Sequence, residues 1–346
     1  YYVVVKNDTL WHPVLGSWSI AEWRYSMKEG LKKTVFARIK NPRSAEVLSG
    51  IMTGDFEDRI MRMEFGKMGL QHLMAISGFH FALIAMMFSM LLRWIAPPKI
   101  ATGILIILLS VYFVVLGGSP SISRAWVMCF IALMGFVAEK PSYALNSIGV
   151  AILFILFYDP LLCQTLGFQF SMVTTASILL WYPIIRVWVE KIFQKRHLGQ
   201  MSKMSLIDQH CYCLLSVIKE GVALAVAVNL TALPMTLHLF EKFPFLSLLY
   251  NLFIPFLVSV SMFLFIIAGL SSVLLPPLGA ILHSINSHFT HFMLNFVYNV
   301  PNTLNYNWRV SDFRAPHLIA YLCIIFLLGI FLNARREEKS LPFAFI

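Results

Sequence analysis

The chain has 346 residues, of which 58% are hydrophobic and 13% are charged, and its mean hydropathy is +0.74. Because a soluble domain carries about 25% charged residues, this composition excludes a soluble enzyme and predicts an integral membrane protein. The net charge of +10 favours anionic over cationic partners. The five cysteines have no spacing typical of a disulfide framework or a zinc site, so we expect free thiols.

Residues 1–69 form a polar segment that we predict to be extracytoplasmic, with short amphipathic helices on the membrane surface. Ser19, followed three residues later by a glutamate, has the spacing of a capping box at the start of the first helix. Asn41-Pro42 should end this helix and cap a second one. Gly54-Asp55 predicts a turn before a third helix. Residues 1–10 are a candidate remnant of an upstream domain.

From Leu70 onward the chain is dominated by apolar runs of about 20 residues, the length that crosses about 30 Å of hydrocarbon. We therefore predict an all-α polytopic membrane protein with a transmembrane domain over residues 70–334 and a cytoplasmic tail over 335–346. Eight or nine transmembrane or re-entrant helices are expected, over 72–93, 100–117, 124–138, 143–158, 167–185, 220–239, 246–270, 277–298 and 317–333.

The asymmetry of lysine and arginine between loops predicts the orientation. The long polar loop 186–219 is assigned to the cytoplasm, and alternation of the spans then places most loop cations on that side. The basic residues of the inter-span loops that fall outside are Arg124, Lys242, Arg309 and Arg314. This distribution favours nine crossings with the N-terminal region outside.

The sequence contains no G-x-x-x-x-G-K-[ST] phosphate loop, no H-E-x-x-H motif and no His/Asp cluster at metal-ligand spacing. We therefore predict no catalytic residue, no metal and no cofactor. The acids between Leu70 and Phe331, outside the basic loop, all lie at the ends of predicted spans: Glu139, Asp159, Glu220, Glu241 and Asp312. A cation-coupled transporter usually needs an intramembrane carboxylate, so this pattern disfavours that class and suits a polyanion.

The first predicted span carries the densest group of polar residues. On one helix, Ser77 and His80 would be about 60° apart and His72 about 80° from His80, so the three would share one stripe. This stripe either lines an aqueous path or holds helices together in lipid. A serine–histidine nucleophile is a third interpretation, and it lacks an acid to orient the histidine.

Further polar positions occur at the starts and bends of later spans. Arg124 opens the third span, where it is either a phosphate clamp or a side chain that snorkels to the headgroups. Gln169 places an amide near the start of the fifth span. Pro234, Asn251 and Pro255 are expected to break the sixth and seventh spans, which is tolerated where the backbone lines a cavity or is buried in protein.

The string G-L-Q-H-L-M-A-I-S-G-F-H over residues 69–80 closely resembles the G-L-x-H-L-x-A-I-S-G-x-H signature of the ComEC competence proteins. Other matching positions follow in the same order along the chain: Gly54-Asp55, Pro120-Ser121-x-x-Arg124-Ala125, Gly167-Phe-Gln-Phe-Ser171, Pro234, Asn251 and Pro255. The resemblance covers roughly residues 45–270.

In that family the polytopic domain is taken to be the inner-membrane channel for one strand of incoming DNA during natural transformation. The resemblance implies that the pathway or its structural signature includes His72, Ser77, Gly78, His80, Arg124, Gln169 and Asn251. Many members add an oligonucleotide-binding-type domain before the spans and a metallo-β-lactamase-like nuclease after them, and we expect neither to be complete here.

The resemblance and the charge pattern together predict a channel for single-stranded DNA in the bacterial cytoplasmic (inner) membrane. Cations outside would gather the strand, and we assign this role to Lys28, Lys32, Lys33, Arg38, Lys40 and Arg43. Because no nucleotide-binding loop is present, the driving force is expected from a cytoplasmic translocase docking on loop 186–219. That loop's cations are alternatively ordinary topology determinants. A DNA receptor and a second copy of the chain are further candidate partners beside the lipid bilayer.

Two other functions remain open from the sequence. In a small-molecule or lipid transporter, the binding site would be the histidines of the eighth segment, His283, His288 and His291. A purely structural membrane scaffold would need no such site.

Overall fold

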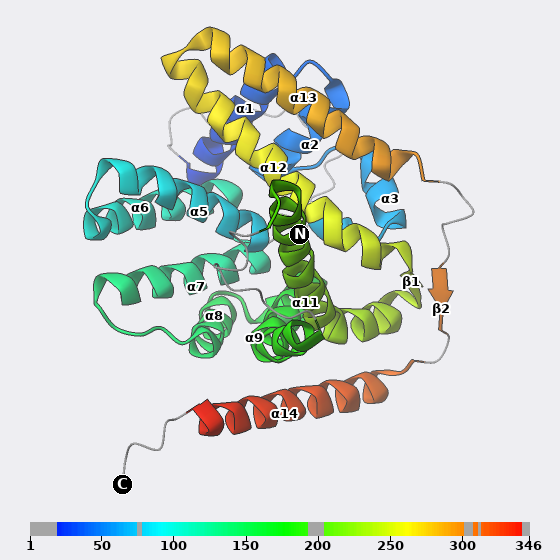
Figure 1. Ribbon diagram of the computed structural model, residues 1–346. Helices are drawn as coiled ribbons and strands as arrows, with labels where there is room; N and C mark the ends of the chain where they lie inside the picture. Colours follow the sequence, from blue (N-terminus) through cyan, green and yellow to red (C-terminus); the bar gives the residue numbers. More distant parts are fainter. Residues whose placement is uncertain (1–18, 75–77, 193–203, 301–306, 311–312, 341–346) are drawn as a thin grey trace, which may run out of the picture.

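The computed structural model describes residues 19–74, 78–192, 204–300, 307–310 and 313–340, and these are almost entirely α-helical (Figure 1). Seven of the described helices are long and apolar enough to cross a membrane. The predicted all-α polytopic class is therefore confirmed. All five cysteines are free, as expected.

Three helices form the N-terminal segment, at the places that their capping residues predict. They are α1 (Ile20–Arg38), α2 (Pro42–Thr53) and α3 (Arg59–Lys67). The Ser19 hydroxyl accepts a hydrogen bond from the Ala21 amide at 3.2 Å, so the first helix is capped at its second residue rather than through a capping box. The Asn41 side chain accepts from the Ser44 amide at 3.1 Å. Gly54 ends α2 with a φ of 83°.

Helix α2 differs from the expected surface helix because most of its side chains are covered by other helices. Val47 and Leu48 are buried on different faces, and the polar Ser44 and Ser49 are buried as well. The Ser44 hydroxyl donates to the Ser287 carbonyl of α13 (Pro276–Tyr298) at 3.3 Å. The second helix of the N-terminal segment is thus part of the packed helical body.

Each predicted span coincides with a helix over its described residues, except that 72–93 begins in a separate four-residue helix and includes 75–77, which lie outside the described residues. The seven helices that are long and apolar enough to cross are α5 (Gly78–Ile95), α6 (Pro98–Leu116), α7 (Pro120–Val137), α9 (Leu166–Ile192), α11 (Leu206–Phe240), α12 (Leu246–Leu274) and α14 (Ala315–Ser340). Helix α8 (Ala144–Tyr158) is shorter, and α13 is long but buries several polar side chains. A four-residue helix, α4 (Gln71–Met74), and the 3-10 helix η1 (Pro160–Gln164) complete the helices used below.

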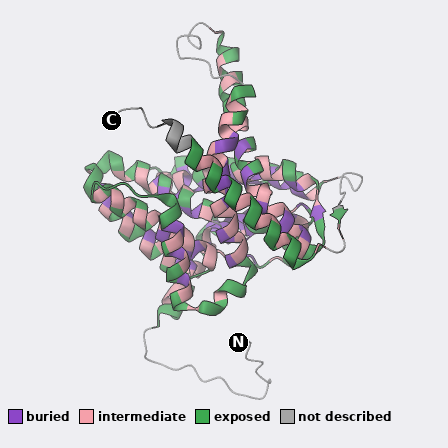
Figure 2. Ribbon diagram, turned by 90° about the horizontal axis from the view of Figure 1, so that it is seen from below, coloured by how far each residue is buried: buried purple, intermediate pink, exposed green. Residues whose placement is uncertain are grey.

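The polar loop predicted over 186–219 is shorter in the structure, because helices extend into it from both sides. Helix α9 continues to Ile192, and α11 begins at Leu206 with the Ser205 hydroxyl accepting from the Asp208 amide at 3.2 Å. As a result, the start of α11 stands out from the helical body (Figure 2).

The prediction that Pro234, Asn251 and Pro255 break their helices is wrong, since α11 and α12 run through them. A proline removes the hydrogen bond to the carbonyl four residues before it. For Pro234 that carbonyl belongs to Leu230, and the Tyr321 hydroxyl of α14 donates to it at 2.9 Å. A neighbouring helix thus supplies the donor that the proline lacks, as membrane helices require.

The three largest of the five buried apolar clusters show which helices pack together. The largest apolar cluster joins α2, α3 and α4 to α5, α12 and α13. A second cluster holds α5, α6 and α7 together, and a third packs α9 and α11 against α14. Figure 1 shows the same arrangement, with the α12–α13 hairpin at the top, α5–α7 on the left and α14 at the bottom.

Two short strands pair at the edge of this body. Strand β1 (Lys242–Pro244) follows α11, and β2 (Asn307–Arg309) precedes α14. They are antiparallel, with Lys242 opposite Arg309 and Phe243 opposite Trp308. The Val310 amide donates to the Glu241 carbonyl at 3.2 Å and extends the pairing. We call this two-stranded element the ribbon.

The close approach of α12 and α13 predicts a stability difference between two glycines. A Cβ at Gly279 would lie 2.6 Å from the Ser272 Cα and 2.7 Å from its nitrogen, whereas a Cβ at Gly269 would meet nothing within 4 Å. We expect Gly279→Ala to destabilise the protein by about 1–3 kcal/mol because backbone atoms must move. Gly269→Ala should be neutral or stabilising by about 0.5–1 kcal/mol. Thermal unfolding of the purified protein in detergent measures both, and equal midpoints would contradict the packing described.

Candidate functional site

Arg124 lies in the second turn of α7, where its guanidinium reaches α9. Its Nε donates to the Ser171 hydroxyl at 2.8 Å, and its Nη1 lies 3.8 Å from the Met128 sulfur, a weak acceptor. The Ser171 side chain is buried, and Arg124 is half-buried. The arginine therefore does not simply snorkel outward, and its contacts tie two apolar helices together.

Gly78 at the start of α5 completes this junction. A Cβ on Gly78 would overlap the Arg124 Nη2, and it would lie 3.4 Å from the Ala125 Cβ. Only a residue without a side chain leaves the guanidinium in its place. Three positions far apart in the sequence thus meet at one point between α5, α7 and α9, and we call Gly78, Arg124 and Ser171 the arginine junction.

The positive charge of the arginine junction has no acidic partner among the described residues. No carboxylate of the described residues forms an ion pair with Arg124, and its one good acceptor is the neutral Ser171 hydroxyl. A cation partly removed from water and left without a counter-ion is costly. An anion that reached this point would be bound by the free guanidinium N–H groups and would offset that cost.

The two histidines of the signature have different surroundings. His80 is fully buried at 0% exposure in the first turn of α5, with its ring 5.9 Å from that of Phe79. His72 in α4 is exposed. Ser77 lies outside the described residues, as do its two predecessors, so whether His72, Ser77 and His80 share one stripe stays a prediction.

Asn251 lies on α12 beside a second polar position that the sequence analysis missed. Within the described part of the chain, the Asn251 Oδ1 and the Ser247 hydroxyl, one turn apart, are buried without a hydrogen-bond partner. Gly69 sits over Ser247 with a φ of +68°, and a Cβ there would lie 2.5 Å from the Ser247 Cβ. The first residue of the signature string therefore packs against Ser247, one helical turn from Asn251.

Gln169 has a local role in the structure. Its Nε2 donates to the Cys163 carbonyl at 3.1 Å and holds η1 against the first turn of α9. The polar atom that reaches Arg124 from α9 belongs instead to Ser171, two residues further on. The signal for Ser171 was present, because it ends the matching string that begins at Gly167.

The six cations assigned to gathering DNA do not form one free set. Lys28 pairs with Asp55 at 2.9 Å and Lys32 with Glu57 at 2.6 Å, and the hydrogen bond that Lys32 donates to the Glu57 carboxylate raises the pKa of Lys32. The remaining four are exposed: Lys33, Arg38, Lys40 and Arg43. The Arg43 guanidinium lies over the Tyr298 ring, 5.0 Å from its centroid. The positive field of α1 is weaker than its composition indicates.

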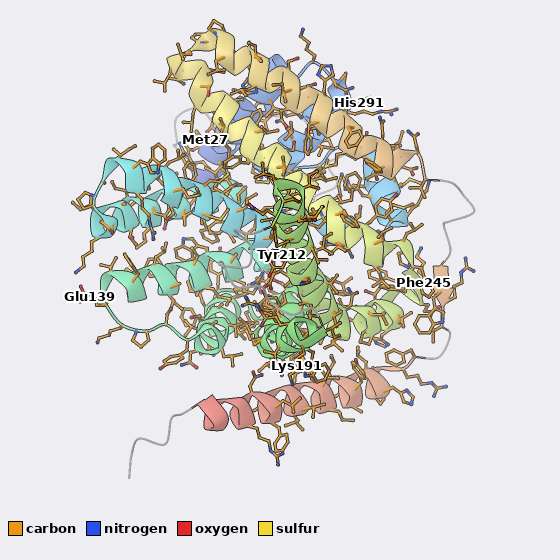
Figure 3. All side chains as sticks on the ribbon, viewed as in Figure 1. Met27, Glu139, Lys191, Tyr212, Phe245 and His291 are labelled. Carbon is orange, nitrogen blue, oxygen red and sulfur yellow. The ribbon has the colours of Figure 1, made fainter. Side chains whose placement is uncertain are left out.

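The three histidines of α13 do not share one environment. His283 is buried with its ring 5.4 Å from that of Phe265, whereas His288 and His291 are exposed (Figure 3 labels His291). In the described part of the chain, no group of three or more His, Cys, Asp or Glu side chains could hold a metal ion. A transporter site built from all three histidines does not match this placement.

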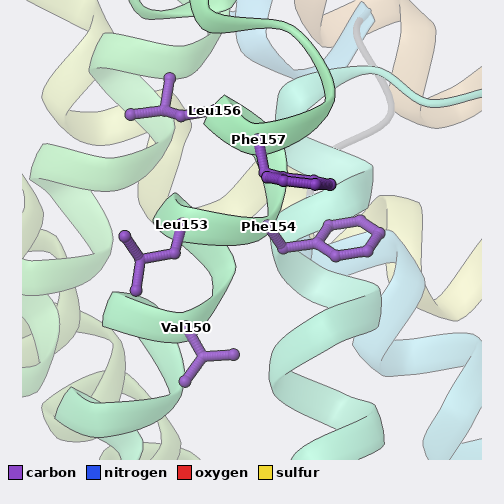
Figure 4. Close-up of a pocket in the computed structure, with 5 residues that line it drawn as sticks. All are labelled: Val150, Leu153, Phe154, Leu156 and Phe157. Carbon is purple, nitrogen blue, oxygen red and sulfur yellow. The ribbon is translucent and has the colours of Figure 1, made fainter.

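An open hollow with a volume of about 580 Å³ lies on α8 (Figure 4). Its lining is purely apolar and consists of Val150, Leu153, Phe154, Leu156 and Phe157. Such a surface suits lipid chains and has no group that could bind a phosphate. A smaller hollow between α9 and α11 includes Arg186 and Glu220, whose Nε and Oε1 are 3.1 Å apart. Neither hollow contains Arg124 or His80.

These features define a multi-pass α-helical membrane protein in which Gly78 and Ser171 meet the half-buried Arg124. Residues 55–336 match the family described as Competence protein, and the chain belongs to that family. The resemblance to ComEC proteins is thereby confirmed. The chain is 28% identical over 222 residues to ComE operon protein 3 of Bacillus subtilis (strain 168). The matched region covers 62% of this chain and 25% of the relative. The chain thus spans about a quarter of that relative's length, and no solved structure matches it.

The arginine junction predicts that Ser171 matters more for stability than a similar residue one turn away. Ser171→Ala leaves the Arg124 Nε without its acceptor, which should cost about 1–3 kcal/mol. Thr175→Val is the matched control, because the Thr175 hydroxyl donates only to the Ser171 carbonyl of its own helix at 2.7 Å. We expect the control to stay within about 0.5 kcal/mol of the parent. Urea or thermal unfolding in detergent gives the comparison, and an unchanged Ser171→Ala protein would remove this role.

Proposed function

We propose that this chain forms the conduit by which single-stranded DNA crosses the bacterial inner membrane during natural transformation. The observation that carries the proposal is the arginine junction: a partly buried guanidinium, without an acidic partner among the described residues, held where three apolar helices meet. Membership of the competence-protein family supports a role in DNA uptake.

The physical argument starts from the charge of each phosphate group. Hydrocarbon rejects an ionised group at a cost of many kcal/mol, so a strand crosses only where side-chain donors, backbone amides and water replace its hydration. The guanidinium of Arg124 supplies such donors, and a carboxylate beside it would repel the strand. The acids of the described spans lie elsewhere, as in the pairs Arg186–Glu190 at 3.2 Å and Arg186–Glu220 at 3.1 Å.

The proposed passage requires the helices of the arginine junction to separate. The contact between Gly78 and the guanidinium leaves no space for a strand between α5 and α7 in the described conformation. In an open state, a phosphate oxygen would replace the Ser171 hydroxyl as the acceptor for Arg124. The exchange conserves the number of hydrogen bonds and adds the attraction between opposite charges.

The proposal includes no catalytic step within this chain. Energy for transport would come from a cytoplasmic translocase that docks at residues 186–219, where α9 ends and α11 begins. On the opposite side, the exposed cations Lys33, Arg38, Lys40 and Arg43 would concentrate the strand, together with a DNA receptor. The N-terminal segment is assigned to the extracytoplasmic side, with α2 packed against α13 as part of the helical body.

Replacement of Arg124 tests the proposal directly. Loss of one charge-assisted contact of about 1.5–3 kcal/mol corresponds to a roughly tenfold or greater fall in transit rate. We therefore expect Arg124→Ala to lower uptake of labelled DNA by about that factor, and Arg124→Lys to have an intermediate effect because lysine keeps the charge without the planar donor fork.

The matched control is Arg93→Ala, because Arg93 is an exposed arginine in the last turn of α5. Protein levels in the membrane are compared for each variant. If Arg124→Ala is present at the parental level and takes up DNA normally, the proposed role of Arg124 is wrong. A deletion strain that takes up DNA normally but fails to grow on a particular solute would instead support a small-molecule transporter, and a scaffold would show neither defect.

The proposed orientation has its own test. In a cysteine-free background, single cysteines are placed at two exposed lysines, Lys33 of α1 and Lys99 near the start of α6. A maleimide that cannot cross membranes should label Lys33→Cys in intact cells whose outer layer has been opened. Lys99→Cys should react only after the inner membrane is permeabilised. The reverse pattern would invert the topology.

A further inference from the structure

The ribbon brings together two cations from distant parts of the chain. Lys242 on β1 and Arg309 on β2 are directly opposite each other in the antiparallel register, and both are exposed. Side chains at opposite positions share one face of the ribbon, with their Cβ atoms about 4.5–5.5 Å apart. Two positive groups are thus fixed side by side on the outer surface.

This arrangement is unfavourable without a partner. Like charges directly opposite each other destabilise a strand pair, and neither Lys242 nor Arg309 forms an ion pair with a carboxylate of the described residues. The adjacent acid Glu241 contributes its backbone carbonyl to the pairing through Val310. A negatively charged group held between the two cations would relieve their repulsion.

The opposite face of the ribbon anchors it to the body. Phe243 is buried and provides this anchor, whereas Trp308 across from it is exposed, with its ring 6.4 Å from that of Phe245. Figure 3 shows Phe245 beside the ribbon at the edge of the molecule. Because the aromatic side chains occupy this face, the cations are directed to the other one.

The basic face of the ribbon continues into the signature segment. Pro244 shares that face with Lys242, and a Cβ at Gly69 would lie 3.1 Å from the Pro244 Cγ. Gly69 begins the string that leads through the exposed Gln71 and His72 to the arginine junction. The two cations therefore lie at the outer edge of the region proposed to admit DNA.

The charge distribution singles out the same place. In the proposed orientation, four cations lie at or beyond the outer ends of the spans: Lys242, Arg309 and Arg314 between helices, and Arg124 in the second turn of α7. Topology rules disfavour lysine and arginine on that side. Two of the four are paired across the ribbon, and a third begins the approach to α14, so these cations are grouped rather than scattered.

We propose that Lys242 and Arg309 form a phosphodiester-binding clamp at the outer mouth of the conduit, which holds the backbone of a single nucleic-acid strand before it enters. This inference rests on the proposed function. Anionic lipid headgroups offer related chemistry, but lipid anchoring needs only flexible side chains that reach the interface. A fixed cation pair continuous with the signature segment suits a strand that must be directed to one point.

Binding of a fluorescently labelled oligodeoxythymidine to the protein in zwitterionic nanodiscs tests the clamp. Anisotropy titrations at several salt concentrations compare the parent with Lys242→Ala, Arg309→Ala and the double variant. For single strands, each lost phosphate contact should make the slope of log K against log salt shallower by about 0.7. The double variant should therefore lose about 1.4 from the slope, and Lys242→Arg should retain the parental value.

Arg93→Ala serves as the matched control and should leave the slope unchanged. Parental slopes in both alanine variants, with parental thermal midpoints showing that they fold, would overturn the clamp. A difference that appears only when anionic lipid is added to the nanodiscs would assign the pair to lipid and also overturn it. DNA uptake by Arg124→Ala separates the two proposals: if it falls while the ribbon variants bind normally, the conduit stands and the clamp does not.

Discussion

The organising interaction of this structure is the placement of one guanidinium among apolar helices. Arg124 can neither lose its charge nor leave the body without breaking its bond to Ser171. Because the guanidinium is large, α5 can approach it only with a glycine, Gly78. Because its N–H groups need acceptors, α9 presents the Ser171 hydroxyl to it. Three helices are thus positioned by one side chain, and the same side chain is the strongest attractor for an anion in the junction.

A second requirement, that polar groups surrounded by apolar helices find partners, explains the other contacts between helices. The Tyr321 hydroxyl satisfies the carbonyl released by Pro234. Between α12 and α13, the Ser261 hydroxyl lies 2.6 Å from that of Thr290 and donates to Asn286 at 3.0 Å. Such contacts favour specific helix pairs more than apolar packing does, because lipid competes equally well for apolar surface.

The sequence predicted most of the helices because apolar length and capping residues are local signals. It also identified Gly78 and Arg124 through a resemblance, without showing that they touch. What it missed depends on residues distant in the chain: the pairing of Lys28 with Asp55, and the donation from Tyr321 that lets α11 continue. A proline or a lysine has no local pattern that reveals which distant group compensates for it.

The length of α11 has a structural consequence. Its 35 residues extend about 52 Å at 1.5 Å per residue, well beyond the thickness of hydrocarbon. One end stands free of the body, and the other leads directly into β1. Its free start and the strand at its far end are therefore joined by one continuous helix that is long enough to cross the hydrocarbon with several turns to spare.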